Sequence, residues 1–251
     1  MFTVIRLPFN GNISQVLYDI NYKLNTMTGY SAEEKSKLLI EFESFNKGIK
    51  QFIGKKFGDD FAKTAAFQIK KEYNSLLEDM PYIGGSDNPL TITITSTTQY
   101  LAVYLVLKRR GKDLKDIGEI CYRHADDFFK NNSDEIMPMD NPQVIGFLKY
   151  MASESENRIY HGDFVFEFVE GEDFDFGLDF KECAICKFFQ EKGADEFVPY
   201  MCAMDIPESK YGCLGLKRTM TLAEGADKCD FRYKKGAPTE IVSAVINEED
   251  F

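Results

Sequence analysis

The chain has 251 residues, 44% of them hydrophobic and 14% aromatic, which is enough to build a sizeable buried core. Its net charge of -11 and its scattered basic residues exclude a nucleic-acid binder, which needs a basic surface to neutralise phosphates. The first residues show no secretory signal, and no apolar stretch approaches the ~20 residues that cross a bilayer. We therefore expect a cytoplasmic protein without a membrane partner, whose six cysteines are reduced thiols.

Apolar residues at helical spacing predict that the first half of the chain is helical. A first helix is predicted over Ile13–Leu24. Ser31 and Glu34 form a capping-box pattern that begins a second helix, and its apolar stripe continues to Phe52. A third helix is predicted over Asp59–Leu77.

A loop rich in Pro, Gly, Asp and Asn, Met80–Leu90, interrupts this pattern. Helical spacing then resumes over three further segments: Thr97–Leu107, Leu114–Phe129 and Pro142–Met151.

The spacing changes to period two near residue 164, which indicates strands. In chain order we expect a strand at Phe164–Val169, a connector at Phe174–Phe180, helices at Glu182–Gln190 and Ala194–Ala203, and strands at Leu216–Ala223 and Cys229–Tyr233. Helices first and strands later predict an α+β fold, with a helical N-terminal half packed on a small, mainly antiparallel sheet from the C-terminal third. The expected parts are a helical extension (1–80), an α+β domain (81–235) and a tail (236–251), or all of these as one compact unit.

The register of the last hairpin decides which side chains meet, because a slip of one residue exchanges the two faces of a strand. A five-residue loop pairs Ala223 with Cys229, and a four-residue loop pairs Glu224 with Cys229. The four-residue loop separates apolar from polar side chains more cleanly and is favoured. It groups Met220, Leu222, Cys229, Phe231 and Tyr233 on one face, and Thr219, Thr221, Asp230 and Arg232 on the other.

Three segments together resemble the L-2-amino-thiazoline-4-carboxylic acid hydrolase family. They are PYIGGSDNP (81–89), FGLDFKECAICKFF (176–189) followed by YMCAMD (200–205), and RTMTLAEGADKCDFRY (218–233). The resemblance covers roughly residues 75–235, and the third segment is its most specific part. The Gly-x-x-x-Cys-x-Phe ending of that segment is also similar, more loosely, to small-ligand-binding 4-vinyl reductase domains.

The resemblance implies a hydrolase that opens a cyclic isothiourea to a carbamoyl-cysteine, without a metal or another cofactor. The small-molecule substrate would carry a carboxylate, which an arginine fork can bind through two hydrogen bonds. The substrate-binding candidates are Arg218, Thr221, Asp230, Arg232, Cys229 and Asn88. A solvated sheet face with an ordinary cross-strand ion pair explains Thr221, Asp230 and Arg232 equally well.

A cysteine thiolate is a suitable nucleophile for a C=N carbon. Cys202 is the first choice, because Asp205 follows three residues later near the end of a predicted helix. Cys183 matches the Glu-Cys pair of the family and is the second choice. Asp205 or Asp230 would transfer protons, while Cys229 falls on the apolar face of the hairpin. For each of these thiols, simple burial in the core is the competing reading.

Cys183 and Cys186 form a CxxC pair, which is compatible with a redox dithiol, half of a metal site or two structural thiols. The pair is expected inside a helix rather than at its start, and the later cysteines do not have zinc-ribbon spacing. Of the two histidines, His124 is expected to be solvated, and His161 is a candidate general base. No nucleotide-binding fingerprint is present.

Two rival functions remain open: a non-catalytic ligand-binding or sensor module, and a cysteine-rich zinc protein. The sequence also leaves the oligomeric state open, a homo-oligomer included.

Overall fold

The computed structural model of the protein describes residues 29–136, 141–243 and 245. Its α-helices are α2 (Ala32–Phe57), α3 (Asp59–Asp79), α4 (Thr91–Arg109), α5 (Leu114–Asn131), α6 (Pro142–Ser155), α7 (Ala184–Glu191), α8 (Val198–Ala203) and α9 (Asp205–Tyr211). Its strands are β1 (Val165–Val169), β2 (Phe176–Glu182), β3 (Leu216–Arg218), β4 (Cys229–Tyr233) and β5 (Glu240–Ile241). Short 3-10 helices are η1 (Gly85–Asp87), η2 (Ser133–Glu135), η3 (Asp195–Phe197) and η4 (Leu222–Glu224).

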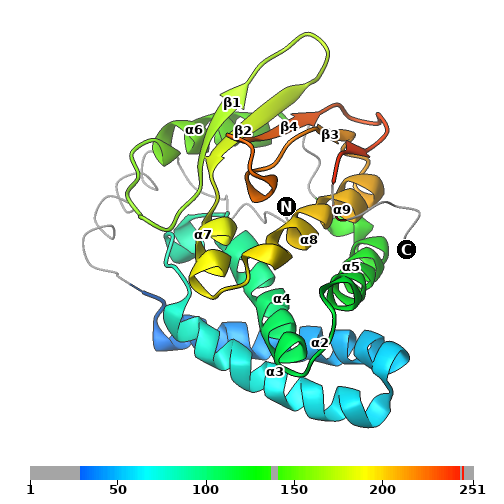
Figure 1. Ribbon diagram of the computed structural model, residues 1–251. Helices are drawn as coiled ribbons and strands as arrows, with labels where there is room; N and C mark the ends of the chain where they lie inside the picture. The colour runs from blue at the N-terminus through cyan, green and yellow to red at the C-terminus, as the bar shows by residue number, and fades with distance from the viewer. Residues whose placement is uncertain (1–28, 137–140, 244, 246–251) are drawn as a thin grey trace.

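The helices lie mostly in the N-terminal half and pack against a mixed sheet formed by the C-terminal part, so the predicted α+β class is confirmed. Figure 1 shows the α2–α3 pair at one end of the molecule and the sheet at the other, with α4, α5 and α7 to α9 between them. The predicted helix at 13–24 lies outside the described residues. No helix in the described part of the chain has the length and apolarity needed to span a bilayer.

Local signals in the sequence determine where helices α2 and α3 begin and end. Ser31 and Glu34 form the predicted capping box, with the Glu34 amide donating to Ser31 Oγ at 3.2 Å. Gly58 joins the two helices with a φ of +88°, a backbone conformation that side-chain-bearing residues rarely adopt. The two predicted helices are therefore confirmed, and α2 continues five residues beyond the predicted stripe, to Phe57.

Helix α4 begins at Thr91, six residues before the predicted start. Its first turns are rich in threonine, which favours strands and turns and hides the helical pattern. The hydroxyls of Thr97 and Thr98 instead donate to carbonyls one turn back, at 2.8 Å to Thr93 and 2.6 Å to Ile94. Bonding within the helix satisfies these polar groups and lets α4 cross the protein core.

The sheet has the strand order β1-β2-β4-β3-β5, with β5 parallel to β3 and the other pairs antiparallel. Strand β2, which pairs on both sides, occupies the segment expected to be a connector, so that prediction was wrong. Its apolar side chains face the core, while Gly177 and Asp179 face outward. A Cβ at Gly177 would lie 2.9 Å from the Phe231 carbonyl oxygen of β4, so the glycine permits a close approach of the strands.

The hairpin of β3 and β4 differs from the favoured register. Leu216 pairs with Tyr233 and Lys217 with Arg232, and β3 ends at Arg218 instead of Ala223. Residues 219–228 form a long connection that contains η4, not a four-residue loop. Asp230 accounts for this ending, because its Oδ1 accepts from the amides of Thr219 and Met220 and turns the chain out of the ladder.

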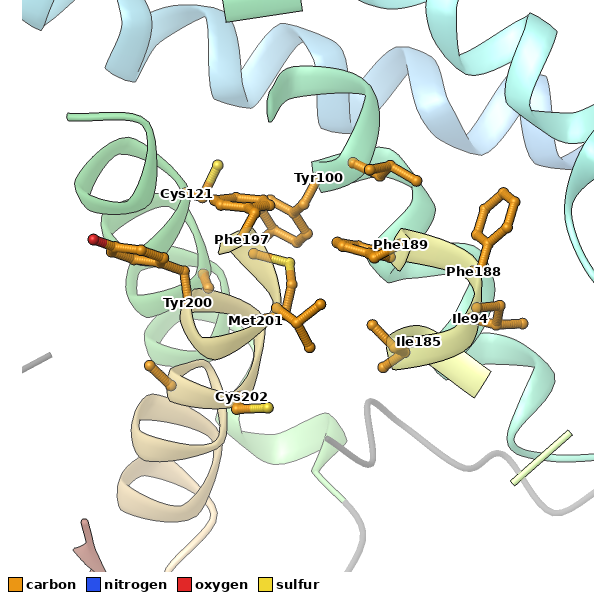
Figure 2. Packing of buried hydrophobic residues seen from close by; sticks show 14 of the residues in the cluster. Ile94, Tyr100, Cys121, Ile185, Phe188, Phe189, Phe197, Tyr200, Met201 and Cys202 are labelled. Carbon is orange, nitrogen blue, oxygen red and sulfur yellow. The ribbon is translucent and has the colours of Figure 1, made fainter. Parts of the chain in front are cut away.

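Two sets of aromatic and aliphatic side chains hold the layers together. On the sheet, Phe176 stacks on Tyr233 with ring centroids 4.9 Å apart. Between the helices, Ile185 and Phe189 of α7 point toward Met201 of α8 (Figure 2). The buried hydrophobic residues of both layers form one continuous cluster.

Gly118 in α5 allows close packing against α8, since a Cβ there would lie 2.0 Å from the Tyr200 ring. We predict that Gly118→Ala lowers the free energy of unfolding by about 1–3 kcal/mol, the usual cost of overpacking. Gly146→Ala is the matched control, because Gly146 is exposed in α6 and a Cβ there meets nothing within 4 Å. The control should gain about 0.5–1 kcal/mol. Equal effects in urea unfolding would contradict the packing of α5 on α8.

Candidate functional site

A small cavity between the helices and the sheet is lined by four of the nine site residues predicted from the sequence. We name it the thiol cavity, and its volume is about 30 Å³. It is lined by Leu90, Thr93, Phe164, Phe180, Cys183, Cys186, Cys202, Arg218, Cys229 and Phe231. The structure thus brings together Cys183, Cys202, Cys229 and Arg218, and adds Cys186. A space of this size holds about one water molecule.

The CxxC pair lies at the start of α7, not in a helix interior as predicted. Cys183 is the N-cap residue, with extended backbone angles (φ -125°, ψ 118°). The Cys183 side chain makes no capping hydrogen bond, but the Cys186 thiol and the amides of Ile185 and Cys186 lie near enough to its sulfur to influence its pKa. The prediction failed because a cysteine is not among the residues that usually mark a helix start.

Arg218 is the buried cation of the cavity, and its side chain is 1% exposed. It forms an ion pair with Asp205, at the start of α9, and donates from Nη2 to the Cys202 carbonyl at 3.1 Å. Its guanidinium carbon lies 5.3 Å from the centroid of the Phe231 ring. Its Nε is buried and has no hydrogen-bond partner, so the cavity wall carries one unused donor.

Burial keeps the cavity thiols protonated. Hydrogen bonding to Cys186 and burial raise the pKa of Cys183 well above its usual value, although the two amides at the start of α7 oppose this. Burial also raises the pKa of Cys202 well above its usual value, against the opposing charge of Arg218. The pKa of Cys229 is raised to about 12, mainly by burial. The nucleophile that the sequence suggested as a thiolate is therefore a neutral thiol in this conformation.

A second hollow of about 100 Å³ adjoins the thiol cavity and shares Leu90 and Phe164 with it. We name it the Asp163 hollow. Burial raises the pKa of Asp163 to about 6, which is close to the value suited to a general base at neutral pH. Sequence reasoning missed this residue and chose His161, two positions earlier, whose side chain is exposed. The only sequence signal was the position of Asp163 just before a strand.

Asn88 lines the Asp163 hollow and not the thiol cavity. Its side-chain amide donates to the Ile83 carbonyl at 2.6 Å and to Asp163 Oδ2 at 2.9 Å. Its oxygen accepts from the Leu90 amide at 2.9 Å. Asn88 therefore fixes the loop before α4 and positions the Asp163 carboxyl, and its contact with a substrate stays a prediction.

The other three predicted binding residues do not line the cavity, and only Asp230 and Arg232 share a face of the sheet, as alternate residues of β4. Thr221 is buried and donates within its own turn. Asp230 is bonded to the backbone of the β3–β4 connection. Arg232 points to the outer side of the sheet, where its Nη1 lies 2.8 Å from Asp179 Oδ1. The predicted polar constellation is not formed because the hairpin register differs, and the binding roles of these residues stay predictions.

A larger hollow, of about 420 Å³, lies between α2, α4, α5, α8 and the start of α9. It contains His124, Asp205 and Glu208, and neither a cysteine nor a cation is among its described lining residues. His124 is not solvated as predicted. It lies against Phe45, Phe52 and Tyr100, and its Nδ1 is 2.9 Å from the Tyr100 hydroxyl. The thiol cavity, where thiols and a buried cation meet, is therefore the candidate functional site.

The thiols of the cavity are not arranged as a metal site. Within residues 29–136, 141–243 and 245, no group of three or more His, Cys, Asp or Glu side chains is placed to hold a metal ion.

The profile of the L-2-amino-thiazoline-4-carboxylic acid hydrolase family matches residues 93–233, more than half of the chain. The chain therefore belongs to this family. All residues that line the thiol cavity except Leu90 fall within the matched range. No curated protein is significantly similar to the chain.

The contribution of the Arg218–Asp205 ion pair to the free energy of unfolding can be tested by substitution. Asp205→Asn leaves a buried cation without its counter-charge, and we predict a loss of about 3–5 kcal/mol in the free energy of unfolding. Glu43→Gln is the control, because Glu43 and its partner Lys70 are 53% and 51% exposed. It should cost about 1 kcal/mol or less in urea unfolding. Equal, small losses would mean that Arg218 is not held as described.

The lowered pKa of His124 predicts that the folded protein loses stability in acid. Burial lowers the pKa of His124 from 6.5 to about 4, so between these pH values the unfolded chain binds more protons than the folded one. The stability that neutral His124 contributes is therefore present above pH 6.5 and lost as the pH falls to 4, by up to about 3 kcal/mol. His124→Gln should flatten the stability profile in this window. Parallel profiles for the two proteins would show that His124 titrates normally.

Proposed function

We propose that this protein is a hydrolase that opens a small heterocycle carrying an amidine-like carbon and a carboxylate, with 2-amino-thiazoline-4-carboxylate as the first substrate to test. The family description supports the reaction class. The single observation that carries the proposal for this chain is the grouping of four thiols with one buried guanidinium in the thiol cavity. Such a cavity offers a nucleophile for the ring carbon and a cation for the carboxylate.

Arg218 is the proposed carboxylate-binding residue. Of the two arginines considered from the sequence, only Arg218 lines the thiol cavity, and Arg232 is paired with Asp179 outside it. The free Nε of Arg218 supplies a donor that a carboxylate oxygen would satisfy. Asp205 then acts as a positioning residue, because it holds the guanidinium against α9.

Cys183 is the proposed nucleophile, in preference to Cys202. The nearby amides at the start of α7 would stabilise its sulfur as it gains negative charge, and Cys183 is partly exposed. Cys202 is 6% exposed and has no such donors among its described contacts. The neutral thiol suits addition to a C=N bond: as Sγ bonds to the ring carbon, its proton passes to the ring nitrogen.

Asp163 is the proposed general base for the second step. The ring carbon–nitrogen bond breaks in the first adduct, and water, deprotonated by Asp163, then releases the carbamoyl product and the free thiol. The net change is the addition of one water molecule. Lys187 supports this pairing, since it follows Cys186 on α7 and interacts electrostatically with both Asp163 and Cys183.

Substrate binding requires a movement, because the thiol cavity holds about one water molecule. Leu90 and Phe164 line both the thiol cavity and the larger Asp163 hollow. We propose that rotation of these two side chains joins the hollows when the ring enters. The combined space would then place Asp163 and the thiols on opposite sides of the ring.

The assay measures consumption of 2-amino-thiazoline-4-carboxylate by the purified chain. We expect Cys183→Ser and Asp163→Asn each to lower kcat by roughly 100-fold or more. Serine is a favoured N-cap residue, so Cys183→Ser should keep α7 folded. Cys213→Ser, at an exposed position, is the control and should retain full activity. Full activity in Cys183→Ser would remove the nucleophile assignment.

The role of Arg218 is tested on the unaltered protein with 2-amino-thiazoline, which lacks the carboxylate. Loss of a charge-assisted hydrogen bond should lower kcat/KM by roughly 10- to 100-fold relative to the carboxylate. An equal rate with both compounds would contradict the role of Arg218. Binding of the carboxylate without any turnover would favour the alternative, a ligand-binding module, over a hydrolase.

A further inference from the structure

The Cys183–Cys186 pair has a geometry that ring opening alone does not require. Both thiols belong to the first turn of α7, where Cys183 is the N-cap and Cys186 is the third helical residue. Both side chains line the thiol cavity as free thiols, and the Cys186 thiol lies near enough to the Cys183 sulfur to raise its pKa. Two cysteines in one helical turn need little backbone movement to join, and the amides at the helix start partly oppose the burial that raises the pKa of Cys183.

The pair is also more accessible than the other thiols of the cavity. Cys183 and Cys186 are partly exposed, whereas Cys202 and Cys229 are buried. A reagent from solvent would therefore meet the CxxC pair first. The other thiols of the cavity, Cys202 and Cys229, are the groups that could compete for such a reagent, and both are buried.

We propose that Cys183 and Cys186 form a redox-active dithiol, which small-molecule disulfides oxidise reversibly to an intramolecular disulfide. The Cys183 thiolate attacks one sulfur of the small disulfide, and the S–S bond breaks to release one thiol. Cys186 loses its proton and attacks the Cys183 sulfur, which releases the second thiol. Two electrons pass from the cysteine pair to the small disulfide, and two small thiols are formed.

The dithiol proposal can be tested independently of ring opening, because the experiment measures the oxidation state of the Cys183 and Cys186 sulfurs. The reduced full-length chain is incubated with oxidised glutathione at pH 8.5, free thiols are blocked, and the protein is cleaved after lysine. Lys181 and Lys187 bracket a peptide, residues 182–187, that contains both cysteines. We expect this peptide to lose two hydrogens, remain unblocked, and return to the dithiol after treatment with dithiothreitol.

Matched variants separate the pair from the other thiols. Cys186→Ser should abolish the internal disulfide and accumulate glutathione on Cys183, while Cys202→Ser and Cys229→Ser should leave the disulfide intact. Phenylarsine oxide, which bridges two adjacent thiols, should bind the unaltered chain at least 10-fold more tightly than Cys186→Ser. Oxidation confined to the exposed Cys213, or disulfides that join Cys183 to another cysteine, would overturn the proposal.

Discussion

The arrangement of the candidate site depends on the buried ion pair between Arg218 and Asp205. Arg218 extends from the end of β3, and its two terminal nitrogens bind the Asp205 carboxylate and the Cys202 carbonyl. One side chain therefore connects the sheet to α8 and α9. A buried charge that lacks its partner is costly, so this connection fixes where the sheet lies on the helices. The thiol cavity is the space left beside it.

The same burial determines the chemistry available in the cavity. Burial raises the pKa of Cys202 and Cys229, and the neighbouring Cys186 thiol together with burial raises that of Cys183, so these three thiols are proton donors as well as nucleophiles. An amidine-like substrate can accept that proton, so a basic substrate would activate the thiol that attacks it. Asp163, in the hollow that shares Leu90 and Phe164 with the cavity, is held near a pKa of 6 and can act on water in the later step.

Local signals in the sequence were enough to predict the capping box at Ser31, the α2–α3 pair and the α+β class. They also named four members of the cavity, Cys183, Cys202, Cys229 and Arg218, through the family resemblance. Strand β2 was missed because it is defined by pairing with strands distant in the sequence, and its outward Gly177 and Asp179 resemble a loop. Asp163 was missed because burial by distant segments, which the sequence does not show, gives it a pKa suited to catalysis.

The most direct test of the account is a crystal structure of the chain with bound 2-amino-thiazoline-4-carboxylate, captured in Asp163→Asn. The account predicts the carboxylate at the Nε of Arg218 and the ring carbon within bonding reach of the Cys183 sulfur, with Leu90 and Phe164 displaced. A ring bound in the large hollow beside His124, with the thiol cavity closed, would contradict it.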